Sequence, residues 1–381
     1  MIKLTTTLLL VGALMSACTH APRKGQTASQ AAQADSTYYP KYAKGFHINY
    51  FKGYRQIVMN DPWGDTTRQE TLALVADAQL KPSLSKTHTY VLPYPATRWI
   101  ALSSTMVNYA DKLNKKQSIC GVAEPRYIAD EYIQSAIKDG SIRNVGMSMS
   151  PDVEVMVDLE PDFLMVSPFK DNHFAAVKSA GIPIITNADY LEHTPLGRAE
   201  WLVLMGELLG EGKTARQLFN AIEKEYQSVK DLAQKVKNKP SVFTGHLYQG
   251  AWYSPAGESY MANFFKDAGS NYIYSNTVGT GSLTLDYETI ITRAEHTDYW
   301  VMIMNYPDEV TYEEIKKMDE RYIDFDAYKK QQIVITNAAY SGYFEEGLLQ
   351  PHFVLSDLVH ALHPGLLKNY RPRYFHHLTE E

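Results

Sequence analysis

Two segments in different parts of the chain follow one pattern, and this repeat constrains the fold more than any other feature. Residues 152–166 and 286–303 each begin with an aspartate, continue with a glutamate two positions later and an apolar turn, and end in an apolar run. Aspartate is a favoured helix N-cap, and a short apolar run after a helix is typical of a buried strand. An α/β unit that occurs twice predicts two similar lobes with a cleft between them.

The rest of the chain fits two such lobes on either side of a helical segment. Apolar runs that read as strands alternate with helical patterns, an order that predicts largely parallel sheets. Residues 196–236 instead keep helical apolar spacing, interrupted only near Gly210. Residues 45–61 predict a hairpin to which the sequence assigns no role.

We therefore expect an α/β fold with two Rossmann-like lobes of mostly parallel sheets, joined by a long helical spine, and a ligand cleft between the lobes. The spine is a stiff connection, so opening and closing of the cleft should be small. The expected domains are residues 41–195 for the N-terminal lobe, 196–238 for the spine and 239–381 for the C-terminal lobe.

The N-terminus has the pattern of an export signal. Lys3 is followed by a largely apolar run, residues 4–14, that is too short for a permanent membrane span. Small residues stand directly before Cys18, which resembles the cleavage site of bacterial lipoproteins, where the cysteine carries the lipid. We expect a signal peptide over residues 1–17, a lipidated Cys18 that anchors the protein to the membrane in the periplasm, and a flexible tether over residues 18–40. An ordinary signal peptide with an incidental cysteine is the alternative.

Composition excludes several kinds of partner and site. A net charge of −6 without a lysine- or arginine-rich stripe gives no signature of nucleic-acid binding. With Cys18 lipidated, only Cys120 is left, so no internal disulfide can form, and no cysteine or histidine spacing typical of zinc sites occurs. The 27 tyrosines are the unusual feature, and their stiff, amphipathic rings suit both extracytoplasmic surfaces and flat ligands.

Three segments resemble a known family. Residues 159–168 (LEPDFLMVSP), 201–226 (WLVLMGELLGEGKTARQLFNAIEKEY) and 350–364 (QPHFVLSDLVHALHP) are similar to segments of the substrate-binding proteins of ABC importers for ferric siderophores, haem and cobalamin. The resemblance covers roughly residues 98–375. It implies a monomer without a cofactor of its own that binds a small-molecule metal chelate and delivers it to the membrane subunits of an ABC permease. An iron complex, either a ferric siderophore or haem, is the expected ligand, and cobalamin or another corrinoid is the alternative.

Glu154 and Glu288 occupy the same position of the repeated segment and align with the two permease-docking acids of this family. One carboxylate on each lobe, facing basic pockets of a permease, would orient the docked protein and speed the encounter. Both residues also stand in the first turn of a helix, where an acid is favourable beside the helix dipole, and this alternative stays open. Asp152 and Asp286 are expected to be helix N-caps.

Loops at the inner ends of the strands should hold the ligand, because these ends face each other across the cleft. The resemblance places these loops at residues 103–105, 124–127, 168–170, 247–254 and 337–344. Their aromatic rings, Phe344 among them, offer broad contact to a bulky, partly flat ligand, and an arginine can pair with a carboxylate or catecholate oxygen. Loop packing is the alternative for each single residue. The expected ligand-binding residues are Arg126, Tyr127, Phe169, Tyr248, Trp252, Tyr253, Tyr340 and Tyr343.

No pattern in the chain indicates catalysis or metal ligation by side chains, and we expect neither. Gly-x-Ser-x-Gly, His-Glu-x-x-His and phosphate-binding motifs are absent from the sequence. The pair His376–His377 is expected to be solvated in a polar tail. Two alternatives of another class are a lipoprotein enzyme on the same scaffold and a scavenger without a permease partner. The histidines weighed as metal ligands and set aside are His88, His173, His246 and His352.

Overall fold

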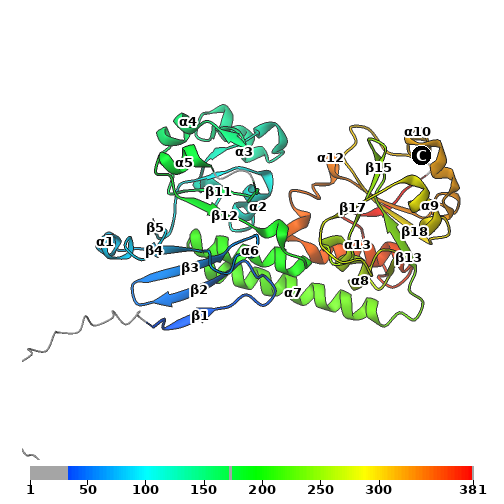
Figure 1. Cartoon of the computed structure of the whole chain (residues 1–381), viewed down its shortest axis with the longest axis horizontal. Coiled ribbons are helices and arrows are strands. Elements are labelled where there is room, and N and C mark those ends of the chain that lie inside the picture. The colour runs from blue at the N-terminus through cyan, green and yellow to red at the C-terminus, as the bar shows by residue number, and fades with distance from the viewer. Residues whose placement is uncertain (1–32, 171–173, 380–381) are drawn as a thin grey trace, which may run out of the picture. The chain divides into compact units, whose positions relative to one another are not determined.

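The computed structural model describes residues 33–170 and 174–379, and Figure 1 shows their helices and strands. Residues from Ala34 onward form one compact unit. The predictions for the signal peptide, Cys18 and His173 concern residues outside this described part. None of the helices in the described part combines the length and the apolar character that a membrane crossing requires.

The N-terminal lobe is built on a five-stranded sheet in which every strand runs parallel to its neighbours. In order across the sheet, the strands are β12 (Ile184–Thr186), β11 (Phe163–Val166), β6 (Trp99–Ala101), β7 (Ile119–Val122) and β8 (Arg143–Asn144). The helices of this lobe are α2 (Ser104–Lys112), α3 (Glu131–Lys138), α4 (Val153–Asp158) and α5 (Ala175–Ser179). The chain enters at the middle strand and extends the sheet to both sides, as in doubly wound α/β folds.

The C-terminal lobe repeats this architecture with a second five-stranded sheet, parallel except at one edge. In order, its strands are β16 (Asn271–Tyr272), β13 (Ser241–Thr244), β18 (Tyr299–Met304), β19 (Ile333–Asn337) and β20 (His376–His377). Its helices are α8 (Tyr260–Asp267), α9 (Tyr287–Ala294), α10 (Tyr312–Met318), α11 (Asp326–Lys329), α12 (Ala338–Ser341) and α13 (Pro351–Leu362). A small antiparallel sheet joins β14 (Leu247–Tyr248), β15 (Ala251–Pro255) and β17 (Ser282–Leu285).

One expectation about this lobe is wrong in part. The pair His376–His377 does not lie in a tail but forms β20, antiparallel to β19, and of the two only His376 is exposed as expected. The half-buried His377 ring lies with its Nε2 3.1 Å from the backbone oxygen of Ala361 in α13. The polar residues around the pair gave no strand signal, because a strand at the edge of a sheet can be short and can be apolar on one face only.

A pair of helices forms the predicted spine between the lobes. Helix α6 (Pro195–Leu208) begins at the N-cap Thr194, whose hydroxyl accepts from the Gly197 backbone N–H. Helix α7 (Gly212–Gln234) follows after a turn in which Gly210 has a φ of +78°. The two helices pack so closely that a Cβ on Gly206 would lie 2.3 Å from the Cβ of Ala215. The prediction of two α/β lobes joined by a helical spine is therefore confirmed.

A further sheet precedes the first lobe and packs on the spine (Figure 1). Its strands, in order, are β1 (Ser36–Tyr38), β2 (Phe46–Phe51), β3 (Tyr54–Asn60), β4 (Gln69–Val75) and β5 (Tyr90–Pro93), and we call it the N-terminal sheet. The β2–β3 hairpin is the one that residues 45–61 predict. The fully buried Ile48 and Ile57 of this sheet belong to the same hydrophobic core as Trp201 of the spine. The N-terminal sheet is therefore an integral part of the core.

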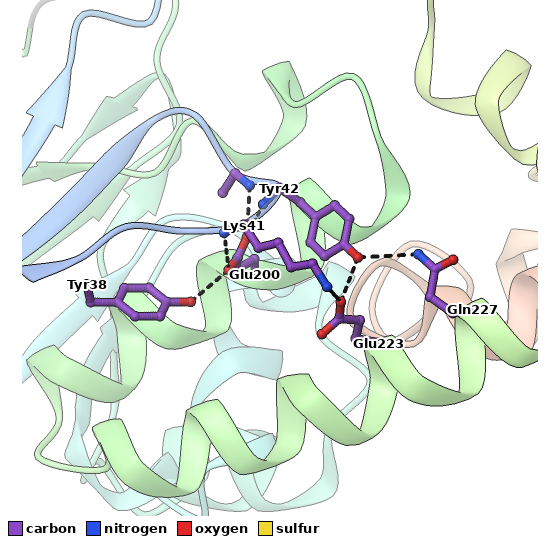
Figure 2. Close-up of polar contacts among 7 residues, drawn as sticks. Tyr38, Lys41, Tyr42, Glu200, Glu223 and Gln227 are labelled. Atoms are coloured by element: carbon purple, nitrogen blue, oxygen red, sulfur yellow. Dashed lines mark hydrogen bonds and ion pairs between the residues drawn. The ribbon is translucent and has the colours of Figure 1, made fainter.

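Two carboxylates of the spine, one of them buried, hold the end of β1 and the connection from β1 to β2 (Figure 2). Glu200 of α6 is 1% exposed and accepts hydrogen bonds from the Tyr38 hydroxyl at 2.7 Å and from the backbone N–H groups of Lys41, Tyr42 and Ala43 at 2.7 to 2.9 Å. These four donors satisfy a charge that would otherwise be costly to bury. On α7, Glu223 accepts from the Lys41 ammonium and the Tyr42 hydroxyl, as Figure 2 also shows.

Candidate functional site

The loops that follow parallel strands of the two lobes meet at a cavity of about 280 Å³, which we call the inter-lobe cavity. The N-terminal lobe contributes α2 and residues 128–130, and the C-terminal lobe contributes residues 338–346 after β19. Asn108 Nδ2 donates a 2.6 Å hydrogen bond to the Glu345 backbone oxygen, so the two walls also contact each other directly. A molecule in this cavity would touch both lobes at once.

The described lining of the inter-lobe cavity mixes apolar and polar residues, and its charged residues are all acidic. Lys116 Nζ lies 2.9 Å from Asp111 Oδ1 and 2.6 Å from Asp130 Oδ2, so one lysine balances two of the lining carboxylates. Glu345 also lines the cavity, and its Oε2 is buried without a hydrogen-bond partner in the described part of the chain. The cavity can therefore hold a ligand that brings hydrogen-bond donors of its own.

A buried polar cluster links both lobes to the spine, and this cluster was not predicted from the sequence. The Tyr109 hydroxyl of α2 donates 2.9 Å to Asp189 Oδ2, which lies 3.8 Å from Arg198 Nε of α6. The same guanidinium lies 5.4 Å from the ring centroid of Tyr260 in α8, and burial raises the pKa of the Tyr260 phenol to about 12. The available signal was Arg198, an arginine inside a helix that is otherwise almost wholly buried.

Three of the expected ligand-binding residues lie at or beside the inter-lobe cavity. Tyr340 lines it with a ring that is 69% exposed, and its hydroxyl donates to the Pro307 backbone oxygen. Arg126 and Tyr127 are exposed on the loop after β7, with the guanidinium 4.6 Å from the tyrosine ring centroid. They directly precede Ile128, which lines the cavity. Of the three, only Tyr340 lines the cavity, and Arg126 and Tyr127 are exposed on the chain that leads to it.

Three other expected residues are exposed but do not line this cavity. Tyr248 and Tyr253 are 59% and 43% exposed on the small sheet of the C-terminal lobe. Phe169, 44% exposed, stacks on Tyr190 with ring centroids 6.4 Å apart and borders a second cavity beside the N-terminal sheet. The structure thus does not gather the expected aromatic residues into one wall.

Trp252 and Tyr343 are core residues, so neither offers surface to a ligand in this structure. Trp252 is 0% exposed, and its indole nitrogen donates 3.0 Å to the Thr244 backbone oxygen. Tyr343 is 2% exposed, with its hydroxyl 3.4 Å from Met261 Sδ. Successive side chains of a strand point to opposite faces, which puts Trp252 inside and Tyr253 outside. The sequence placed both residues in or beside loops but did not show in which direction their side chains point.

Glu154 and Glu288 occupy equivalent places in the two lobes. Each is exposed in the first turn of its helix, α4 and α9 respectively, and neither forms an ion pair within the described residues. The expectation that Asp152 and Asp286 are N-caps is confirmed, because their carboxylates accept from backbone N–H groups three residues later, at 3.1 and 2.7 Å. The two glutamates are therefore not needed as caps.

Residues 33–170 and 174–379 contain no group of three histidine, cysteine, aspartate or glutamate side chains placed to hold a metal ion. Two of the histidines considered from the sequence have other partners. His88 Nδ1 lies 3.1 Å from the Leu84 backbone oxygen, and His352 Nε2 lies 3.5 Å from Glu225 Oε2. What the described site offers is a cavity of mixed polarity with acidic groups in its lining and exposed aromatic rings at or near it.

Both the sequence and the structure of this chain are similar to those of known proteins. A protein of Methanocaldococcus jannaschii described as an uncharacterized lipoprotein is 28% identical over 400 residues, which cover 96% of this chain and 94% of the relative. A periplasmic binding protein of Veillonella parvula has a similar structure, with a TM-score of 0.60 and 17% identity, over 81% of this chain and 97% of that protein. A periplasmic heme binding protein of Pseudomonas aeruginosa gives a TM-score of 0.57 at 15% identity, over 74% of this chain and 98% of that protein.

The family match covers the spine and reaches into both lobes, ending before α13 and β20 of the C-terminal lobe. Residues 100–340 fit the periplasmic binding protein family, from the first strand of the N-terminal lobe to the loop that lines the inter-lobe cavity in the C-terminal lobe. This range is more than half of the chain, and the chain therefore belongs to the periplasmic binding protein family.

Proposed function

We propose that this chain is an extracytoplasmic, lipid-anchored substrate-binding protein that delivers an iron complex, a ferric siderophore or haem, to an ABC permease. The observation that carries the proposal is the inter-lobe cavity, because its walls come from both lobes and touch each other through Asn108 and Glu345. A ligand held there interacts differently with open and closed arrangements of the lobes, which is what couples binding to a change that a permease can recognise. The lipoprotein relative supports the anchor, and the heme binding neighbour supports the ligand class.

The exposed rings beside the cavity fit this ligand class. A cavity of about 280 Å³ would enclose only part of a large chelate, so the rest would lie against the surface beside it. Tyr340 and Tyr127 would supply flat apolar contact there, and Arg126 would pair with a carboxylate or catecholate oxygen of the ligand. The chain would release this ligand unaltered, since binding and handover require no chemistry.

The proposed ligand class is tested by thermal unfolding of the protein with ferric siderophores, haem, cobalamin and cobinamide. The true ligand at about 100 times its Kd adds about 2.7 kcal/mol and raises the melting temperature by several degrees. Tyr340→Ala should weaken this ligand about tenfold or more. Tyr39→Ala, which removes a ring that is 72% exposed on the N-terminal sheet, should bind it normally. A ligand that stabilises both variants as much as the wild type does not bind at the inter-lobe cavity.

Handover is tested with Glu154→Gln and Glu288→Gln together. Because both carboxylates are exposed and neither is a cap, the double variant should keep the stability and the ligand affinity of the wild type. We expect its ligand uptake into cells that carry the permease to fall about tenfold or more, from the loss of two charge pairs with the permease. Glu309→Gln removes an exposed acid elsewhere and should transport normally. Normal uptake by the double variant would favour a scavenger that does not dock through these acids.

A further inference from the structure

A second cavity, of about 390 Å³, lies between the N-terminal sheet and the N-terminal lobe, and we call it the lateral cavity. One wall consists of residues 59–63 and 67–70, at the ends of β3 and β4 and in the loop between them. The other wall consists of the ends of β11 and β12 together with Phe169 and α5. No residue lines both this cavity and the inter-lobe cavity. The whole first wall lies before residue 100, where the family match begins.

Glu70 breaks the pattern of β4 at this cavity. Side chains alternate along a strand, so Glu70 shares a face with Leu72 and Leu74, which are fully buried. A carboxylate therefore stands where the sheet otherwise presents apolar side chains to the core. Its carboxyl group makes no hydrogen bond within the described residues. Burial raises the pKa of this carboxyl group. The charge of Lys178 acts on this pKa in the opposite direction, but Lys178 is not within ion-pair distance, so a ligand cation beside the carboxylate would stabilise it further.

Lys178 of α5 supplies the opposite charge to the same cavity. Its ammonium is exposed, and no carboxylate of the described residues lies within ion-pair distance. The other two charged residues that line the cavity already have partners. Asp61 accepts from the backbone N–H groups of Trp63 and Asp65 at 2.9 and 3.1 Å, and Arg68 Nε lies 3.2 Å from Asp65 Oδ2. Among the described lining residues, one negative and one positive group thus have no ion-pair partner.

Apolar and aromatic side chains line the same cavity as these two charges. Met59, Val166 and Ile184 line the cavity and are each at least 95% buried. Trp63 and Phe169 line it with rings that are each 44% exposed, and a neighbouring lysine, Lys170, has its Nζ 5.4 Å from the Trp63 ring centroid. The cavity therefore offers a flat or bulky apolar body a place beside both charged groups.

We propose that the lateral cavity is a second ligand site and that it takes a small zwitterion with an apolar body, an α-amino acid with an aromatic side chain. The ammonium group of the ligand pairs with Glu70, its carboxylate pairs with Lys178, and its ring packs against the exposed rings of Trp63 and Phe169. Both charges of the ligand are needed, since neither Glu70 nor Lys178 has a hydrogen-bond or ion-pair partner among the described residues, and their charges act on each other only over a longer distance. This site is independent of the proposed transport ligand, because the two cavities share no lining residue.

The test is isothermal titration of the full-length protein with L-tryptophan, tryptamine, which lacks the carboxylate, and indole-3-propionate, which lacks the amine. We expect tryptophan to bind with one site per chain, and each analogue to bind at least about tenfold more weakly. Absence of tryptophan binding, or equal binding of all three compounds, overturns the proposal. This comparison uses the wild type and does not depend on the folding of any variant.

Variants assign each charge to its residue. Glu70→Gln should bind tryptophan no more tightly than the wild type binds indole-3-propionate. Lys178→Gln should bind tryptophan no more tightly than the wild type binds tryptamine. Glu309→Gln and Lys213→Gln, which remove exposed charges away from both cavities, should bind tryptophan as the wild type does. Tyr340→Ala should also leave tryptophan binding unchanged. Loss of tryptophan binding in Tyr340→Ala would place the ligand in the inter-lobe cavity and overturn the proposal.

Discussion

His352 shows how strongly the packing of this protein acts on a single group. The ring stands at the start of α13, is 8% exposed, and has an Nδ1 without a hydrogen-bond partner among the described residues. Burial, followed by the positive charges of Arg373 and Lys112, lowers the pKa of this histidine from 6.5 to about 4. The Glu225 carboxylate, 3.5 Å away, acts in the opposite direction, but it is 63% exposed and screened by water.

This shift makes stability depend on pH in a definite direction. The unfolded chain binds a proton at His352 below about pH 6.5, whereas the folded chain does so only near pH 4. The folding stability that the neutral His352 ring contributes is therefore complete above pH 6.5 and is lost as the pH falls toward 4. Between pH 7.5 and 5.0, urea unfolding of the wild type should show a loss roughly 2 kcal/mol larger than that of His352→Gln. Equal losses in the two proteins would mean that this ring is solvated.

At the scale of elements, the features that could be predicted from the sequence are those that depend on a local pattern of residues. Apolar periodicity located both lobes and the spine, and the aspartates at residues 152 and 286 were identified as caps from position alone. Alternation in β15 could also have separated the buried Trp252 from the exposed Tyr253, had it been applied within the loop. The aromatic content of a loop does not by itself say which rings face a ligand.

What depends on partners distant in sequence could not be predicted. Glu200 and Glu207 read as ordinary polar positions of a spine helix, yet both are almost fully buried. Glu207 accepts from the Tyr50 hydroxyl and pairs with Arg216, and Glu200 is satisfied by residues that precede β2. No local signal announces such a contact, because the donors come from a sheet that folds back on the helix from far along the chain. The role of the predicted hairpin was hidden for the same reason.

At the scale of the whole molecule, the family match and the folding unit do not coincide. The match begins at residue 100, but the main hydrophobic core continues into the N-terminal sheet through Phe46, Ile48 and Ile57. Gly45 lies so close to the spine that a Cβ there would be 2.3 Å from the Trp201 ring. A spine shaped to receive this sheet presents a large apolar surface without it, since α6 has almost no exposed residue.

This continuity predicts the outcome of two truncations. A chain that begins at residue 95 keeps all matched residues but loses the sheet, and so exposes several buried apolar side chains worth about 1.5 to 3 kcal/mol each. That sum reaches the typical net stability of a folded domain, about 5 to 15 kcal/mol, so we expect no cooperative unfolding transition by circular dichroism. A chain that begins at residue 34, just before β1, should unfold like the full-length protein. If the shorter chain unfolded cooperatively near the melting temperature of the longer one, the two lobes and the spine would be sufficient for folding, and the N-terminal sheet would be an appendage kept for the lateral cavity alone.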